Sequence, residues 1–201
     1  MFAVLVPLKR PDRAKTRLAK SGVHEHQQLA VAFAWDTVAA AQGSPLVAGV
    51  WVVTDAVDLV PPGAQHLEDK GEGSLNRALA RAAATVQHLQ PTLAVAALCA
   101  DLPSLTSEDL TDALAAVGTR RSFVADAAGT GTTLLVAPPG VELAPAFGEH
   151  SAQRHADSGA TALLGALPTL RLDVDTAEDL DRARSRGVGD NTARTLTERE
   201  H

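Results

Sequence analysis

Asp101 is the residue whose type and position most directly suggest chemistry. It ends an unbroken apolar run, residues 93–100, and is followed at once by Leu102 and Pro103. Such a run, closed by a proline-containing turn, is typical of a strand buried on both faces of a parallel sheet, and ligands of open α/β sheets bind beyond the carboxyl ends of these strands. The Asp101 carboxylate is therefore either a metal ligand or a turn residue that accepts hydrogen bonds from local backbone amides.

A second acidic pair, Asp173 and Asp175, closes a later apolar segment, residues 170–174. Alternate residues of an extended chain point to the same side, so the two carboxylates share a face. Mg²⁺ is commonly held by one or two carboxylates, with water and substrate phosphates completing its octahedron, and Asp101 with one of this pair would be enough. Asp175 has an alternative role as the N-cap of a helix that starts at Thr176, whereas Asp173 has no comparable local role.

Basic side chains gather in the segment after the first apolar run, residues 2–7. They are opposed only by Asp12, and they are Lys9, Arg10, Arg13, Lys15, Arg17 and Lys20. A basic loop between a strand and a helix, at the same sheet edge as Asp101, could hold a polyphosphate, because lysine and arginine donate charge-assisted hydrogen bonds to phosphate oxygens. The glycine pattern of a Walker A loop is absent, and the alternative is a solvated run of surface charge.

A third candidate is the segment around Ser151, which follows Gly148 and is predicted to cap a helix that runs to Ser158. Helix starts bind phosphate or carboxylate groups through free backbone amides, although Ser151 could also be a plain N-cap. Arg154 and His155 could add contacts or could lie on a solvated helix face. No Ser-His-Asp arrangement stands out, and attack of one phosphate on another needs no base, only positioning and charge neutralisation.

The composition excludes several partners. A formal net charge of -6 and 3% aromatic residues argue against nucleic-acid binding. No stretch reaches ~18 apolar residues and no basic region precedes the first apolar run, so we expect no membrane span, no signal peptide and a cytoplasmic protein. The single cysteine, Cys99, lies inside an apolar run and is expected to be buried and inert, which excludes Cys/His metal clusters.

Apolar periodicity predicts the elements that position these residues. Predicted strands span 2–7, 49–54, 93–100, 122–125, 132–137 and 170–174, and predicted helices span 24–42, 74–90, 106–117, 151–158 and 176–186. A glycine-rich turn, residues 129–131, precedes the strand at 132–137 and allows close approach of a ligand. Alternation of this kind predicts a three-layer α/β sheet, as one domain over 1–188 with a flexible tail at 189–201.

Several short blocks occur in order between residues 4 and 188. They are Lys15-Thr16-Arg17-Leu18, Ser74-Leu75-Asn76-Arg77-Ala78-Leu79, Ala100-Asp101-Leu102-Pro103, Phe123-Val124-Ala125-Asp126 with Gly129-Thr130-Gly131-Thr132-Thr133, Phe147-Gly148 with Ser151, and Asp173-Val174-Asp175-Thr176. Each block alone is weak, but their joint order resembles the CofC/FbiD family, the guanylyltransferases of coenzyme F-420 biosynthesis. The chain departs from that pattern at Ala100, where relatives often have glycine, and in the variable pair between Gly148 and Ser151.

The resemblance implies a Rossmann-like GT-A nucleotidyltransferase sheet, mixed and mostly parallel. It also implies transfer of GMP from GTP to phosphoenolpyruvate or 2-phospho-L-lactate, with Mg²⁺ and release of pyrophosphate; the oligomeric state stays open. The implied phosphoenolpyruvate contacts are Thr133, Gly148 and Ser151, and the implied metal ligands are Asp101 and Asp173, with Asp175 as a neighbour. The implied nucleotide contacts are Lys15, then Lys9 and Arg17 for the triphosphate, and Asn76 near the nucleoside; Lys15 and Asp101 are the implied catalytic residues.

Three alternatives remain. Another nucleotidyltransferase of this fold, loading a molybdopterin or a sugar phosphate, would usually have a glycine-rich first loop, where this chain has Arg10-Pro11-Asp12-Arg13-Ala14. A GT-A glycosyltransferase would release a free nucleoside diphosphate in place of pyrophosphate. A noncatalytic regulator would bind GTP without releasing pyrophosphate from any acceptor.

Overall fold

The computed structural model describes residues 1–9 and 23–199. In that part of the chain a seven-stranded sheet has the order β3-β2-β1-β4-β6-β5-β7. The strands are β1 (Phe2–Pro7), β2 (Val47–Thr54), β3 (Gln65–Glu68), β4 (Ala94–Leu98), β5 (Ser122–Ala125), β6 (Thr132–Ala137) and β7 (Thr161–Ala162). Only β6 runs against its neighbours, and all other described pairs are parallel. The predicted mixed, mostly parallel sheet is confirmed.

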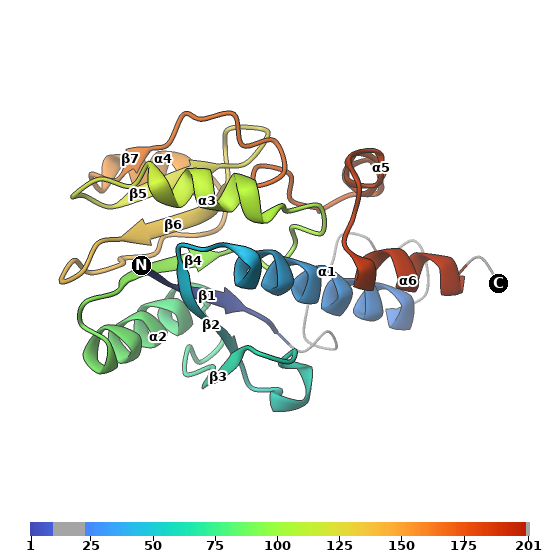
Figure 1. The fold of residues 1–201 in the computed structure, drawn as a ribbon, viewed down its shortest axis with the longest axis horizontal. Coiled ribbons are helices and arrows are strands. Elements are labelled where there is room, and N and C mark those ends of the chain that lie inside the picture. Colours follow the sequence, from blue (N-terminus) through green and yellow to red (C-terminus); the bar gives the residue numbers. More distant parts are fainter. Residues whose placement is uncertain (10–22, 200–201) are drawn as a thin grey trace.

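Helices cover both faces of the sheet (Figure 1). They are α1 (Val23–Gly43), α2 (Leu75–Leu89), α3 (Ser107–Ala115), α4 (Ser151–Asp157), α5 (Ala177–Arg186) and α6 (Asp190–Arg199), with a short 3-10 helix, η2 (Val57–Leu59). Val4 and Val6 of β1 pack with the apolar side chains of α1 and α3, whereas Ala3 and Leu5 pack with those of α2. This alternation gives three layers, because successive side chains of a strand point to opposite faces. None of the described helices is long and apolar enough to cross a bilayer.

One edge of the sheet collects the chain segments predicted to carry chemistry. The carboxyl ends of β1, β4 and β5 lie at this edge, and β6 begins there because it runs in the opposite direction. The Cys99 amide donates to the Thr133 carbonyl at 2.9 Å, which ties the residue after β4 to the start of β6. The loops that contain Lys9, Asp101 and the glycine-rich turn therefore converge.

The predicted last strand, residues 170–174, is wrong: the segment is a turn followed by irregular chain. Its backbone groups bond to loops and not to a neighbouring strand. The Ala127 amide donates to the Arg171 carbonyl at 2.8 Å, and the Val174 amide donates to the Asp101 carbonyl at 3.0 Å. The second bond still brings the acidic pair around Val174 to the Asp101 loop.

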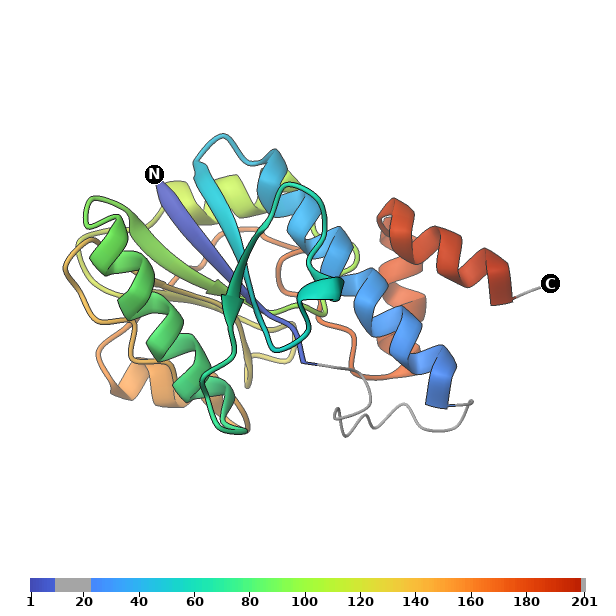
Figure 2. The ribbon, with the colours of Figure 1, turned by 90° about the horizontal axis from the view of Figure 1, so that it is seen from below.

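Within the segment expected to be a flexible tail, residues 190–199 form α6, which lies beside α1 (Figure 2). The anchor is Asp36 of α1, a buried side chain. Its Oδ1 accepts from the amide nitrogen and the Nδ2 of Asn191 at 3.0 and 2.9 Å, and its Oδ2 accepts from the Thr192 amide at 2.8 Å. A carboxylate at the start of a helix binds the free amides of the first turn, so this contact fixes α6.

We expect Asp36→Ala to lower the free energy of unfolding by ~2–4 kcal/mol, because it leaves the first amides of α6 without their buried acceptor. Urea denaturation would measure the change, and limited proteolysis would locate it in residues 187–199. Asp190→Ala, an exposed acid at the start of the same helix, is the matched control, with an expected change below ~1 kcal/mol. Equal stability of Asp36→Ala and the wild type would contradict the anchoring role.

Candidate active site

The Asp101 carboxylate lies buried at the sheet edge without a hydrogen-bond partner on its Oδ1 atom. Its backbone, by contrast, is held on both sides. The Leu102 amide donates to the Thr37 hydroxyl of α1 at 3.3 Å, and the same hydroxyl oxygen lies 3.4 Å from the Ala100 carbonyl oxygen. With the bond from Val174, the loop presents one carboxylate in a fixed place, and the Oδ1 atom of that carboxylate has unused acceptor capacity.

Neighbouring carboxylates share this environment. Burial, followed by the charges of Asp173 and Asp175, raises the pKa of Asp101 to about 7. Burial also raises the pKa of Asp173 to about 6, with Asp126 and Asp175 adding to the shift. Within residues 1–9 and 23–199, no lysine or arginine forms an ion pair with Asp101 or Asp173. Like charges that are held together without a cation are a physical signature of a cation site.

A divalent cation fits this donor set. The half-buried carboxylates of Asp101 and Asp173 supply hard oxygen ligands, and the buried Oδ1 atom of Asp101 has no protein partner. The described residues contain no group of three or more His, Cys, Asp or Glu side chains arranged for a metal, so water and substrate would complete the coordination, as is usual for Mg²⁺. Asp175 is exposed, and Thr176 caps α5 through the Asp179 amide, so the alternative role of Asp175 as the N-cap is wrong.

The nearby thiol does not take part in this chemistry. Burial, followed by the charges of Asp101 and Asp173, raises the pKa of Cys99 well above its ordinary value. Its Sγ atom donates to the Thr132 carbonyl at 3.3 Å. The expected inert thiol is therefore consistent with the structure, because a nucleophilic cysteine requires a lowered pKa.

The glycine-rich turn lies at the same sheet edge and forms the other side of the site. Its amides at Thr130 and Gly131 donate to the Asp126 carboxylate at 2.9 and 2.8 Å. A Cβ atom at Gly131 would lie 2.4 Å from that carboxylate, so the turn requires glycine there. The Thr130 carbonyl accepts from the Ala152 amide of α4 at 3.1 Å, which joins the turn to the helix start. Thr133, two residues after Gly131, has a fully buried hydroxyl with no hydrogen-bond partner.

The helix start at Ser151 differs from its prediction. The N-cap of α4 is His150, in the left-handed conformation and without a side-chain cap, while Ser151 is the first helical residue and is buried. The Ser151 amide donates to the Gly148 carbonyl at 3.1 Å. With the Ala152 amide also engaged, the first two amides of α4 are not free for an anion, so Ser151 can contribute only its side chain.

His155 does not lie on a solvated face of α4, because its side chain is 0% exposed. The Ala146 amide donates to its Nε2 atom at 2.9 Å, so its Nδ1 atom carries the proton and donates to the Thr132 hydroxyl, also at 2.9 Å. Burial, followed by the positive charges of Arg121 and Arg154, lowers the pKa of His155 to about 4. His155 is thus a neutral structural bridge.

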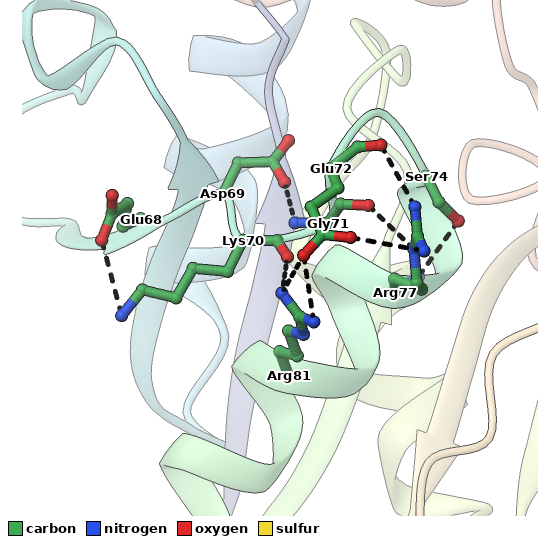
Figure 3. Close-up of polar contacts among 8 residues, drawn as sticks. All are labelled: Glu68, Asp69, Lys70, Gly71, Glu72, Ser74, Arg77 and Arg81. Carbon is green, nitrogen blue, oxygen red and sulfur yellow. Dashed lines mark hydrogen bonds and ion pairs between the residues drawn. The ribbon is translucent and has the colours of Figure 1, made fainter.

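Asn76, expected near the nucleoside, instead binds the backbone of Phe147. Its Nδ2 atom donates to the Phe147 carbonyl at 3.1 Å, and its Oδ1 atom accepts from the Phe147 amide at 2.8 Å. The loop before α2 is braced separately: Figure 3 shows Arg77 and Arg81 turned back onto the loop carbonyls and onto Glu72. The start of α2 is therefore rigid on both sides of Asn76.

The predicted triphosphate contacts are tested only in part. Lys9 is exposed at the carboxyl end of β1, at the Asp101 edge, whereas Lys15 and Arg17 lie outside the described residues. Sequence reasoning missed Thr37 and Asp126 as supports of the site. Thr37 gave no signal, because a hydroxyl within a helix usually bonds its own helix, as Thr37 also does through the Phe33 carbonyl at 2.9 Å.

Structural comparison defines the class of protein. A protein from Desulfovibrio desulfuricans, assigned to the nucleotide-diphospho-sugar transferases, matches with a TM-score of 0.69 and 18% identity over 99% of this chain and 95% of its own. A 4-diphosphocytidyl-2C-methyl-D-erythritol synthase matches with a TM-score of 0.54 and 14% identity over 92% and 97%. These likenesses concern the fold, and they place the protein in the class of three-layer α/β proteins with a Rossmann-like, mixed and mostly parallel sheet.

Sequence comparison then gives the family. The family described as "Guanylyl transferase CofC like" matches residues 2–198. Proteins named phosphoenolpyruvate guanylyltransferase from Streptomyces avermitilis and Nocardia farcinica are 50% and 46% identical, over 96% of this chain and over 92% and 89% of their own lengths. The chain belongs to the CofC guanylyl transferase family, and the resemblance inferred from the ordered blocks is confirmed.

We expect Asp101→Asn to stabilise the protein at pH 8. In the folded state Asp101 retains its proton up to about pH 7, whereas in the unfolded chain it loses it near 3.8, so its contribution to stability is lost as pH rises through that window. The asparagine of the variant has no carboxyl group to ionise, so the variant avoids this loss of stability. Its free energy of unfolding should exceed that of the wild type by at least ~1 kcal/mol at pH 8 and by much less at pH 4.5. Denaturant unfolding at both values measures the difference, and a variant less stable than wild type at pH 8 would contradict it.

Proposed function

We propose that this protein transfers the guanylyl group of GTP to the phosphate of phosphoenolpyruvate. The products would be enolpyruvyl-diphospho-guanosine and pyrophosphate, in the biosynthesis of coenzyme F-420. The observation that carries the proposal is the pair of half-buried carboxylates, Asp101 and Asp173, at a sheet edge that also carries the unpartnered hydroxyl of Thr133. The names of relatives up to 50% identical supply the acceptor and the nucleotide.

In this proposal Asp101 and Asp173 hold Mg²⁺, with Asp175 as an exposed neighbour. When bound, the cation would neutralise phosphate charge and orient the triphosphate. Lys15, with Lys9 and Arg17, would hold the triphosphate oxygens, since lysine and arginine bind phosphate directly. Asn76 is not proposed as a contact to the nucleoside, because both polar atoms of its amide are engaged with Phe147.

Thr133, Gly148 and Ser151 would bind the acceptor. A phosphate oxygen of phosphoenolpyruvate would attack the α-phosphorus of GTP in line, forming one phosphorus–oxygen bond while the bond to the β-phosphate breaks and pyrophosphate leaves. The attacking oxygen is already anionic, so the step needs no general base, in agreement with a site that contains carboxylates, hydroxyls and amides but no activated nucleophile. The side chains position the reactants and balance their charge.

A pyrophosphate-release assay tests the proposal. GTP and ATP would each be combined with phosphoenolpyruvate, 2-phospho-L-lactate and 3-phosphoglycerate, with Mg²⁺ present or withheld. Release from GTP and phosphoenolpyruvate only with Mg²⁺ would support it. Faster pyrophosphate release with 2-phospho-L-lactate would identify that compound as the acceptor in place of phosphoenolpyruvate. Release of a free nucleoside diphosphate would indicate a glycosyltransferase. GTP binding without release from any pair would indicate a noncatalytic protein.

We expect Ser151→Ala to raise the KM for phosphoenolpyruvate by at least about tenfold and to leave the KM for GTP within about twofold, since a hydrogen bond to an anionic oxygen is worth ~1.5–3 kcal/mol. Steady-state kinetics with each substrate varied in turn gives both constants. Ser185→Ala, whose hydroxyl bonds only its own helix on α5, is the control. Equal changes in both KM values would remove Ser151 from the acceptor site.

We expect Asp101→Asn to lose at least ~3 kcal/mol of transition-state stabilisation, which is over a hundredfold in kcat/KM. The reason is the loss of a charged, unpartnered oxygen ligand for Mg²⁺. Thermal unfolding gives an independent readout: Mg²⁺ should raise the Tm of the wild type and not that of the variant. Turnover close to wild type by the folded variant would rule out the metal role.

A further inference from the structure

The segment Ala146–Phe147 has an unusual way of satisfying its backbone. It lies in the irregular chain between β6 and α4, residues 138–150, outside the regular hydrogen bonding of strands and helices. Yet all four of its backbone polar groups are bound by side chains. The Ala146 amide donates to His155, the Ala146 carbonyl accepts from Arg154 at 3.1 and 2.9 Å, and the amide and carbonyl of Phe147 bind Asn76.

These three side chains come from two separate helices. Asn76 belongs to the first turn of α2, whereas Arg154 and His155 belong to α4. Long irregular loops are normally mobile, and complete satisfaction of successive backbone groups fixes this one at a chosen place. The residue that follows, Gly148, has a φ of +115°, a conformation that favours glycine and turns the chain into α4.

His155 also connects this segment to the other wall of the acceptor site. Its Nδ1 atom donates to the hydroxyl of Thr132, the residue before Thr133, while its Nε2 atom holds Ala146, two residues before Gly148. Its ring packs against Phe123 and Phe147, with ring centroids 5.9 and 5.3 Å apart. One side chain thus sets the separation between β6 and the 146–151 segment.

We propose that Asn76, Arg154 and His155 are positioning residues that fix Gly148 and Ser151 opposite Thr133 and thereby control binding of the small phosphorylated acid. The proposal rests on the proposed function, because it assigns these three acceptor contacts to that acid. None of the three positioning side chains touches the acceptor in this account. They act through the backbone of Ala146 and Phe147, so their loss should change the affinity for the acceptor more than that for the nucleotide.

The test compares matched variants. Asn76→Leu keeps the side-chain volume and removes both bonds to Phe147. His155→Phe keeps a ring between its aromatic neighbours and removes both bonds, whereas His155→Gln retains a carbonyl that can accept from Ala146. Arg154→Met removes the exposed guanidinium that binds the Ala146 carbonyl, and its control is Gln153→Met, the adjacent exposed residue, whose side chain donates to Asp157 on the same helix.

We expect the KM for phosphoenolpyruvate to rise about tenfold in Asn76→Leu and His155→Phe and about threefold in Arg154→Met, with the KM for GTP within about twofold in each. His155→Gln should recover part of the loss. Gln153→Met should match the wild type. Amide hydrogen exchange, measured without substrate, should be slow at Ala146 and Phe147 in the wild type and faster in the variants that remove their acceptors.

The two readouts separate the possible failures. If the wild type showed slow exchange at these amides but no pyrophosphate release from GTP and phosphoenolpyruvate, the proposed function would be overturned. The fixed conformation of Ala146 and Phe147 would still be supported. Fast exchange at the Ala146 and Phe147 amides of the wild type would show that the three side chains do not fix this segment. An active wild type whose Arg154→Met and Asn76→Leu variants raise both KM values equally, or neither, would overturn the positioning role.

Discussion

The burial of an unpaired carboxylate at the end of β4 is the constraint on which the rest of the site depends. Asp101 has no cation beside it in the described residues and shares its surroundings with Asp173, so the folded chain holds negative charges together at a cost. Fixed supports maintain that arrangement: the Thr37 hydroxyl beside the loop and the Val174 amide on the Asp101 carbonyl. The apolar layers on both faces of the sheet supply the stability that offsets the cost.

The antiparallel strand β6 supplies the side of the site that faces the Asp101 carboxylate. Because β6 runs against β4 and β5, it starts where they end, and Thr133 comes to lie beside the chain just before Asp101. A parallel strand in that place would put its first residues at the far edge. The glycine-rich turn between β5 and β6 can then be short, and the Asp126 carboxylate satisfies its amides.

The sequence predicts the parts of this fold that depend on local pattern. Continuous apolar runs locate β1, β4 and β6, and position after such a run singles out Asp101. The failures come from contacts distant in sequence: α6 depends on the Asp36 carboxylate of α1, and residues 170–174 bond to loops. His155 is an instructive case, because it lies three residues after Ala152, on the same buried face of α4. Helical spacing could have revealed its burial, but not its bond to Thr132.

The manner in which the 146–151 segment is held has a physical consequence for selectivity. Phosphoenolpyruvate and phospholactate differ by one hydrogen pair and by planarity, and pockets separate such close shapes weakly unless their contacts are rigid. Under the proposed function, the hydroxyls of Thr133 and Ser151 and the turn at Gly148 would bind the small acid, so discrimination would depend on how firmly the turn is placed. The neutral side chains of Asn76 and His155 and the charged guanidinium of Arg154 bind the backbone groups of this segment and would provide that rigidity.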